Sequence, residues 1–227
     1  MTDAVTEFAA RRNDILKRIG TAARAADRSV GDVALVGVSK KQPEDRIETA
    51  LASGHRVFGE SRVQEAEARW SPRRVDYPDL ELRLIGPLQT NKAEQAVALF
   101  DVIETLDRLK LARALRKAMD RTGRCPSLYV QVNTGEEDQK AGIAPHDVPD
   151  FLENLRSEFG FEIDGLMCIP PVDEPAGPHF ALLADLAAAN AIANLSMGMS
   201  DDFETAVKFG ATSVRVGSAL FGTRPSA

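Results

Sequence analysis

Short runs of small and β-branched apolar residues recur along the chain, and longer segments with helical spacing of apolar positions separate them. Short apolar runs bounded by polar segments are typical of strands that are buried on both faces of a parallel sheet. The pattern predicts strands at residues 33–38, 56–59, 82–86, 102–105, 128–132, 165–169, 194–197 and 213–216.

Helices are predicted between these strands, because apolar residues return at helical spacing and proline or glycine marks many of the boundaries. A first helix over about residues 5–26 precedes the first strand and carries Phe8, Ile15 and Ile19 on one stripe. The remaining helices are expected to start near Pro43, Arg62, Asn91, Leu106, Pro145, Pro178 and Asp201.

Eight strands that alternate with helices give the element count of a TIM (β/α)8 barrel. We therefore predict a single α/β domain over residues 1–227, with a barrel over about residues 32–222 and the helix at 5–26 as an N-terminal addition. An open doubly wound sheet is the alternative. In both architectures functional residues lie at the carboxyl ends of the strands, so candidate chemistry is sought there.

Composition and charge narrow the classes of partner. The contents of apolar residues (44%) and charged residues (27%) are ordinary for a soluble globular protein. A formal net charge of −6 without a basic block argues against nucleic acid or an anionic membrane as a partner. No apolar run reaches membrane-spanning length, and the two cysteines supply neither a disulfide framework nor a metal cluster. We expect a cytoplasmic monomer that binds no metal.

Lys40 closes the apolar run of the first predicted strand. Apolar walls at a strand end strip water from an ammonium group, and such desolvation lowers the pKa of a lysine and frees its amine to attack carbonyls. The alternative is a lysine that extends its charged head into solvent beside Lys41, and on this segment alone that alternative is favoured.

The segment Ser-Met-Gly-Met-Ser-Asp-Asp at 196–202 leaves the seventh predicted strand and opens a helix. Free backbone N–H groups and the positive end of a helix dipole suit a phosphate, and Ser200 can donate its hydroxyl. Gly217 and Ser218 offer further N–H groups after the eighth strand, where barrels typically build a phosphate site. A plain helix cap, with Asp201 and Glu204 as a capping-box-like pair, is the commoner meaning of such a junction and stays open.

Polar residues also occur inside the predicted strands. Arg215 lies within the apolar last strand, where burial is expensive unless an anion or another acceptor meets the guanidinium. In the fifth strand Tyr129, Gln131 and Asn133 share one parity and are expected to face the barrel interior, whereas Leu128, Val130 and Val132 face the helices. The first and last strands of a barrel are neighbours, so Lys40, Arg215 and the phosphate cup together suit a phosphorylated aldehyde.

Several motifs occur in the order of a known family. They are Val-Ser-Lys at 38–40, Phe-Gly-Glu-Ser at 58–61 with Gln-Glu at 64–65, Ile-Gly-Pro-Leu-Gln-Thr-Asn-Lys at 85–92, Gln-Val-Asn at 131–133, Gly-Leu-Met at 165–167, Leu-Ser-Met-Gly-Met-Ser-Asp at 195–201 and Val-Arg-Val-Gly at 214–217. Over residues 33–221 the chain resembles the pyridoxal phosphate (PLP) homeostasis proteins, whose fold is that of the alanine racemase N-terminal barrel.

This resemblance implies a set of roles. PLP is the implied cofactor, and Lys40 is implied to hold it as a Schiff base. Ser200 and the amides of Gly217 and Ser218 are implied to hold the phosphate, and Arg215 is implied to face the pyridine nitrogen. The full set of cofactor-binding candidates is Lys40, Ser61, Ser196, Met199, Ser200, Arg215, Gly217 and Ser218. Ser61 and Arg83 stand where members of the family often have asparagine and histidine.

The leading hypothesis is a protein that binds PLP, limits its reactivity and supplies it to apo-enzymes without catalytic turnover. Arginine stays charged and can only donate hydrogen bonds, so Arg215 favours an unprotonated ring nitrogen and weakens PLP as an electron sink. A PLP-dependent racemase-like enzyme is the first alternative, and a barrel isomerase or aldolase that uses Lys40 on a sugar phosphate is the second.

Overall fold

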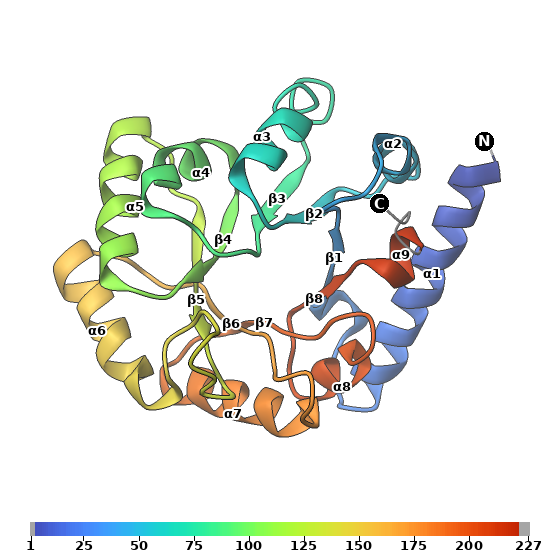
Figure 1. The fold of residues 1–227 in the computed structure, drawn as a ribbon. Helices are drawn as coiled ribbons and strands as arrows, with labels where there is room; N and C mark the ends of the chain where they lie inside the picture. Colours follow the sequence, from blue (N-terminus) through green and yellow to red (C-terminus); the bar gives the residue numbers. More distant parts are fainter. Residues whose placement is uncertain (1–2, 223–227) are drawn as a thin grey trace.

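The computed structural model describes residues 3–222 and contains a closed barrel of eight parallel strands (Figure 1). Each strand pairs with its neighbour in sequence, and the last strand pairs with the first. The predicted TIM barrel is confirmed, and the alternative of an open doubly wound sheet is wrong. The strands are β1 (Ala34–Val38), β2 (Val57–Glu60), β3 (Glu81–Leu84), β4 (Val102–Leu106), β5 (Ser127–Val132), β6 (Gly165–Cys168), β7 (Asn194–Ser196) and β8 (Ser213–Val216).

Helices surround the barrel and lie between successive strands (Figure 1). They are α1 (Asp3–Arg24), α2 (Glu44–Ala52), α3 (Val63–Trp70), α4 (Ala93–Leu99), α5 (Leu109–Thr122), α6 (Val148–Phe159), α7 (Ala176–Ala189), α8 (Phe203–Lys208) and α9 (Ser218–Phe221), with 3₁₀ turns at Val30–Asp32, Thr90–Lys92 and Pro145–Asp147. The expected helices start within about one turn of their predicted positions. Helix α9 was not predicted, because its four residues are too few to show a period. Between residues 3 and 222, no helix is both long and apolar enough to cross a membrane.

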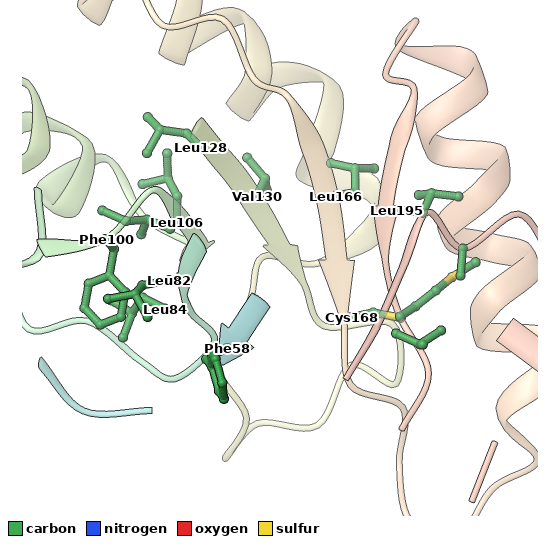
Figure 2. Packing of buried hydrophobic residues seen from close by; sticks show 14 of the residues in the cluster. Phe58, Leu82, Leu84, Phe100, Leu106, Leu128, Val130, Leu166, Cys168 and Leu195 are labelled. Atoms are coloured by element: carbon green, nitrogen blue, oxygen red, sulfur yellow. The ribbon is translucent and has the colours of Figure 1, made fainter. Parts of the chain in front are cut away.

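A continuous apolar layer fills the space between the strands and the helices (Figure 2). The outward-facing residues of β5 are Leu128, Val130 and Val132, and all three belong to this layer. Helix α1 contributes Phe8 and Ile15, which are at most 2% exposed, and it contacts α2, α8 and α9. The predicted apolar stripe of the first helix therefore packs on the outside of the barrel, on the side of β1 and β8 (Figure 1).

The opposite faces of the strands line a polar barrel interior. Tyr129 and Gln131 are buried but lie outside the apolar layer, as their parity in β5 predicts. Gly165 of β6 leaves room for the tyrosine ring, since a Cβ at this glycine would fall 2.3 Å from a ring carbon of Tyr129. Arg83, Glu104, Ser196 and Arg215 are buried in the same way.

The pairing of β1 with β8 brings the segment that carries Lys40 next to the segment that carries Gly217 and Ser218. Gly37 of β1 is opposite Val216 of β8 in the parallel register. Lys40 and Ser218 follow these partners within three residues, so both leave the barrel at the carboxyl-terminal mouth on neighbouring strands. That residues 1–227 form a single domain stays a prediction.

Candidate ligand site at the carboxyl ends of the strands

Lys40 lies in a tight turn directly after β1. The turn is closed by the Gln42 amide, which donates to the Ser39 carbonyl at 3.1 Å. Lys41 occupies the third position of this turn with a φ of 58°, in the left-handed region. Lys40 itself is half-buried. Lys41 is exposed, and the role of Lys40 as the reactive amine stays a prediction.

A cavity of about 230 Å³ adjoins this turn and is lined by Lys40, Lys41, Ser61, Arg62 and Glu65. Ser61 follows β2, and the structure thus brings Ser61 and Lys40 to one cavity wall. The backbone after β3 packs against Ser61, because a Cβ at Gly86 would fall 2.3 Å from the Ser61 carbonyl oxygen. A second cavity of about 730 Å³ shares Ser61 and Arg62 and extends over Val63, Gln64, Pro87, Leu88, Gln89, Lys92 and Arg108.

Ser200 and Ser218 come together across the loops that follow β7 and β8. Their hydroxyl oxygens lie 3.5 Å apart. Ser218 is the first residue of α9, and Gly217 is its N-cap. The amides at the start of a helix have no carbonyl partner within that helix, so they are available to an anion. The predicted phosphate-binding residues Ser200, Gly217 and Ser218 thus form one cluster at the barrel mouth.

The loop between β7 and α8 depends on a glycine. Gly198 has a φ of 92°, and a Cβ there would fall 2.5 Å from the Cβ of Ala206 in α8. Its carbonyl accepts a hydrogen bond from the Arg215 amide at 2.9 Å. A larger residue at position 198 would therefore clash with α8 and disturb the loop that carries Ser200.

The backbone amide of Met199, one of the cofactor-binding candidates, already has a partner within the protein. Its amide donates to the Asp202 carboxylate at 2.5 Å, and its side chain is 38% exposed. Glu204 does not form the alternative capping box, because it accepts from Arg18 of α1 at 3.0 Å. The arginine holds the pKa of the Glu204 carboxyl below its usual value. The Asp202 carboxylate thus occupies one N–H group of the expected phosphate cup.

Arg215 is buried in the barrel interior, and acceptors of the protein meet both of its Nη atoms. The Nη1 atom donates to Ser196 Oγ and the Nη2 atom donates to the Cys168 carbonyl, both at 2.7 Å. Ser196 in turn donates to Glu104 Oε2 at 2.5 Å. The sequence-based requirement for an acceptor at this arginine is confirmed, and Ser196 is the residue that links Arg215 to a buried carboxylate.

A second arginine lies at the other side of Glu104. Arg83 donates to Glu104 Oε1 at 3.2 Å and to Glu81 Oε1 at 2.6 Å. Burial alone would lower the pKa of Arg83, but the two carboxylates outweigh burial and hold that pKa above its ordinary value. Burial also raises the pKa of the nearby Tyr129 phenol, and the positive charge of Arg83 opposes that rise. A hydrogen-bonded chain thus runs from Arg215 through Ser196 and Glu104 to Arg83.

The sequence reasoning missed Glu104. The available signal was its position in the apolar segment Val-Ile-Glu-Thr at 102–105, where it takes the same inward parity as Tyr129 in the next strand. The site as a whole presents an amine, a pair of hydroxyls beside helix-terminal amides, and a buried guanidinium. An amine condenses with aldehydes, and hydroxyls with free amides bind phosphate, so the donor set fits a phosphorylated aldehyde.

Sequence comparison places the barrel in a defined class. Residues 16–225 match the model of the family described as alanine racemase, N-terminal domain. Structures of much lower sequence identity agree on the fold. An alanine racemase of Clostridium difficile superposes with a TM-score of 0.67 at 16% identity, over 93% of this chain and 56% of that chain.

Curated relatives of similar length carry a more specific name. "Pyridoxal phosphate homeostasis protein" of Pseudomonas aeruginosa is 41% identical over 221 residues, which is 92% of this chain and 93% of the relative. The protein of the same name from Aquifex aeolicus is 35% identical, over 94% of this chain and 97% of the relative. The chain therefore belongs to the family of pyridoxal phosphate homeostasis proteins.

Solved structures of a similar protein are described with and without a ligand. PipY of Synechococcus elongatus, in a structure described as having PLP bound, superposes with a TM-score of 0.77 at 38% identity, over 92% of this chain and all of that chain. The structure of PipY without PLP gives a TM-score of 0.78 at 41% identity, over 84% of this chain and 93% of that chain.

Proposed function

We propose that this chain binds PLP through Lys40 and serves in PLP homeostasis, holding the cofactor reversibly as a Schiff base and supplying it to apo-enzymes. The observation that carries the proposal is the position of Lys40 at the end of β1, on the strand next to the one that presents Ser218 and Arg215. The names of the curated relatives and the PLP-bound structure of PipY support the same cofactor.

The residues present fit PLP in their chemistry. PLP supplies an aldehyde for an amine, and as a cofactor it can act as an electron sink. Lys40 offers the amine at the cavity. Ser200, Ser218 and the amides at the start of α9 are the donors for the phosphate. Met199 fits less well, since the Asp202 carboxylate occupies its amide.

Arg215 favours binding over turnover. Its guanidinium cannot give up a proton at neutral pH, so facing the ring nitrogen of PLP it would donate a hydrogen bond and favour an unprotonated nitrogen. Ser196 and the Cys168 carbonyl hold the guanidinium in the barrel interior at 2.7 Å each. Tyr129 is the conceivable proton donor or acceptor in this interior, and burial raises its pKa, which makes it a poor base. We therefore place this protein among PLP carriers, with no racemase turnover.

A spectroscopic titration with two matched variants tests the proposal. PLP added to the wild-type protein should give the visible absorbance of a protein-bound Schiff base, and Lys41→Ala should retain it. Lys40→Ala should lose it if Lys40, and not Lys41 on the same cavity, holds the cofactor. If added PLP gives no Schiff-base absorbance with the wild-type protein, the hypothesis of a sugar-phosphate isomerase or aldolase is favoured instead.

Two functional assays separate a carrier from an enzyme. PLP-loaded protein should restore the activity of a PLP-dependent apo-enzyme when the two are mixed. The same loaded protein should exchange the α-proton of L-alanine in deuterated water no faster than free PLP does. Exchange well above that background, lost in Lys40→Ala, would identify a racemase-like enzyme.

A further inference from the structure

The turn that carries Lys40 contains a residue in an unfavourable backbone conformation. Lys41 has a φ of 58°, and residues with a side chain rarely adopt this region because the Cβ crowds the following carbonyl. The hydrogen bond from the Gln42 amide to the Ser39 carbonyl, at 3.1 Å, closes the turn. Such a conformation persists only where the surrounding structure stabilises it.

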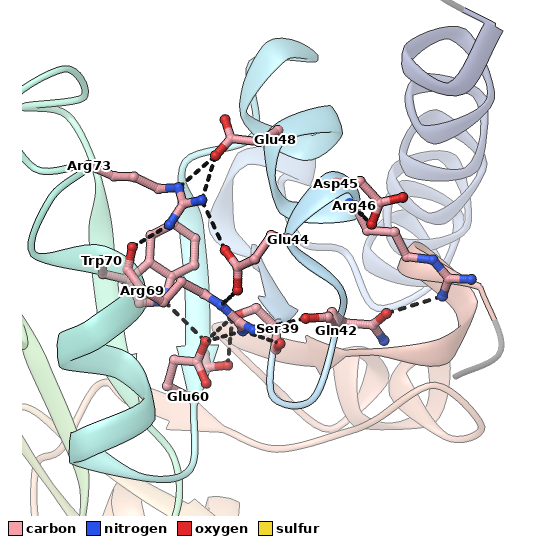
Figure 3. Close-up of polar contacts among 11 residues, drawn as sticks. Ser39, Gln42, Glu44, Asp45, Arg46, Glu48, Glu60, Arg69, Trp70 and Arg73 are labelled. Carbon is pink, nitrogen blue, oxygen red and sulfur yellow. Dashed lines mark hydrogen bonds and ion pairs between the residues drawn. The ribbon is translucent and has the colours of Figure 1, made fainter. Parts of the chain in front are cut away.

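Arg69 supplies that stabilisation from α3. Its Nη1 atom donates to the Ser39 carbonyl at 2.7 Å, and its Nη2 atom donates to the Gln42 carbonyl at 2.8 Å (Figure 3). One guanidinium therefore bridges the first and last residues of the turn that presents Lys40. The side chain of Arg69 is only 14% exposed, so these bonds are largely shielded from water.

Two carboxylates hold the guanidinium in this orientation. Arg69 Nε donates to Glu44 Oε1 of α2 at 2.9 Å, and Nη1 also donates to Glu60 Oε1 at 3.1 Å. Glu60 Oε1 further accepts from Ser39 Oγ at 2.7 Å and from Trp70 Nε1 at 3.0 Å. The rigid fork of arginine donors serves all four acceptors at once, which a lysine ammonium cannot do.

Glu60 makes the arrangement depend on Arg69. The Glu60 side chain is 1% exposed, and its Oε2 atom accepts no hydrogen bond within residues 3–222. A buried carboxylate with donors on one oxygen only requires a nearby positive charge. Arg69 is the arginine that forms an ion pair with this carboxylate.

We propose that Arg69 is a positioning residue for Lys40. By bridging the Ser39 and Gln42 carbonyls it fixes the Lys40 turn before PLP arrives, so that binding does not have to order this segment. The inference rests on the proposed function, because it concerns the lysine that would hold PLP. It assigns to α3 a direct part in the affinity for the cofactor.

Arg73 provides a matched control for a substitution of Arg69. It lies one helical turn further along the chain and is bound to the same Glu44 at 2.9 Å. Its other hydrogen bonds go to Glu48 and to the Arg69 carbonyl, so its partners do not include residues 39–42. Arg69→Met and Arg73→Met therefore remove the same charge and the same length of side chain, but only the first removes the bridge.

The experiment measures PLP affinity by absorbance titration and amide exchange of Lys41 and Gln42 by NMR in PLP-free protein. Arg69→Met should weaken PLP binding by about tenfold or more and accelerate exchange in the turn by a similar factor, because the loss of even one charge-assisted bond corresponds to about tenfold. Arg73→Met should change both by less than about twofold. Arg69→Lys should fall between the wild type and Arg69→Met.

The remaining outcomes also decide whether Arg69 positions Lys40. If Arg69→Met does not fold because the Glu60 charge is left unpaired, Arg69→Met combined with Glu60→Gln carries the same comparison. Equal effects of the Arg69 and Arg73 substitutions would overturn the inference, and so would faster exchange with unchanged PLP affinity. Failure of the proposed function would look different, because the wild-type protein would then bind no PLP on Lys40, whereas the exchange rates would still report on the bridge.

Discussion

Replacing Glu104 by glutamine probes the polar interior of the barrel most sharply. Glu104 is fully buried and accepts from Ser196 at 2.5 Å and from Arg83 at 3.2 Å. A glutamine amide of the same shape has one acceptor oxygen, so one of these two donors would meet an NH₂ group. The substitution also leaves the buried guanidiniums of Arg83 and Arg215 without their shared negative charge.

The expected loss in the free energy of unfolding follows from these contacts. A hydrogen bond to a charged group contributes about 1.5–3 kcal/mol, and breaking a buried ion pair costs about 3–5 kcal/mol. Because Arg83 keeps Glu81 and Arg215 keeps the Cys168 carbonyl, we expect Glu104→Gln to lower the free energy of unfolding by about 3 kcal/mol. Glu81→Gln removes the partly exposed carboxylate and should cost about 1 kcal/mol or less.

Urea unfolding followed by fluorescence measures both variants. Trp70 is the only tryptophan in the chain and is fully buried, so its emission reports on loss of the packed state. The transition midpoint should shift much further for Glu104→Gln than for Glu81→Gln at an unchanged slope. Equal shifts would refute the reasoning, because they would mean that the buried carboxylate is not the centre of the network.

Three further predictions concern stability and binding. The pKa of His55 is lowered from 6.5 to about 4, and burial of the side chain is the largest cause of this shift. Neutral His55 therefore stabilises the fold above pH 6.5. That contribution, about 3 kcal/mol, should disappear as the pH falls from 6.5 to 4, and acid titration of His55→Gln should lack this part of the fall. Ser200→Ala with Ser218→Ala should weaken PLP about tenfold or more but leave pyridoxal, which has no phosphate, nearly unchanged in an absorbance titration. Equal losses for both aldehydes would place the phosphate elsewhere. Gly165→Ala should lower the urea midpoint, because its Cβ would fall 2.3 Å from a ring carbon of Tyr129. Tyr129→Phe should not relieve this loss, because phenylalanine keeps the ring, and relief by Tyr129→Phe would contradict the prediction.

The barrel itself could be predicted from the sequence because each strand is a short apolar run and proline or glycine marks many of the boundaries. Lys40 and Arg215 could be predicted as candidates for the same reason, since a charged residue at the end of an apolar strand or within it is conspicuous. Lys40 and Arg215 become neighbours through the pairing of β1 with β8, which the predicted barrel requires and an open doubly wound sheet would not.

The supporting residues could not be predicted in the same way. Arg69 is an ordinary charged position on a short helix, and its contact with the Lys40 turn arises only when α3 packs beside β1 and β2. The Met199 amide was expected to face a ligand, but the Asp202 side chain folds back onto it, and sequence does not fix the direction of a side chain in a loop. Interactions that depend on tertiary packing are therefore the part that the structure adds.

Chemical trapping of the cofactor on one lysine tests the central proposal most directly. The PLP-loaded protein is reduced with borohydride, digested and mapped by mass spectrometry, with Lys41→Ala treated in parallel. We predict that the pyridoxyl label lies on Lys40 in both proteins. A label found mainly on Lys41, Lys92 or Lys140 would contradict the assignment of Lys40 as the PLP-binding residue.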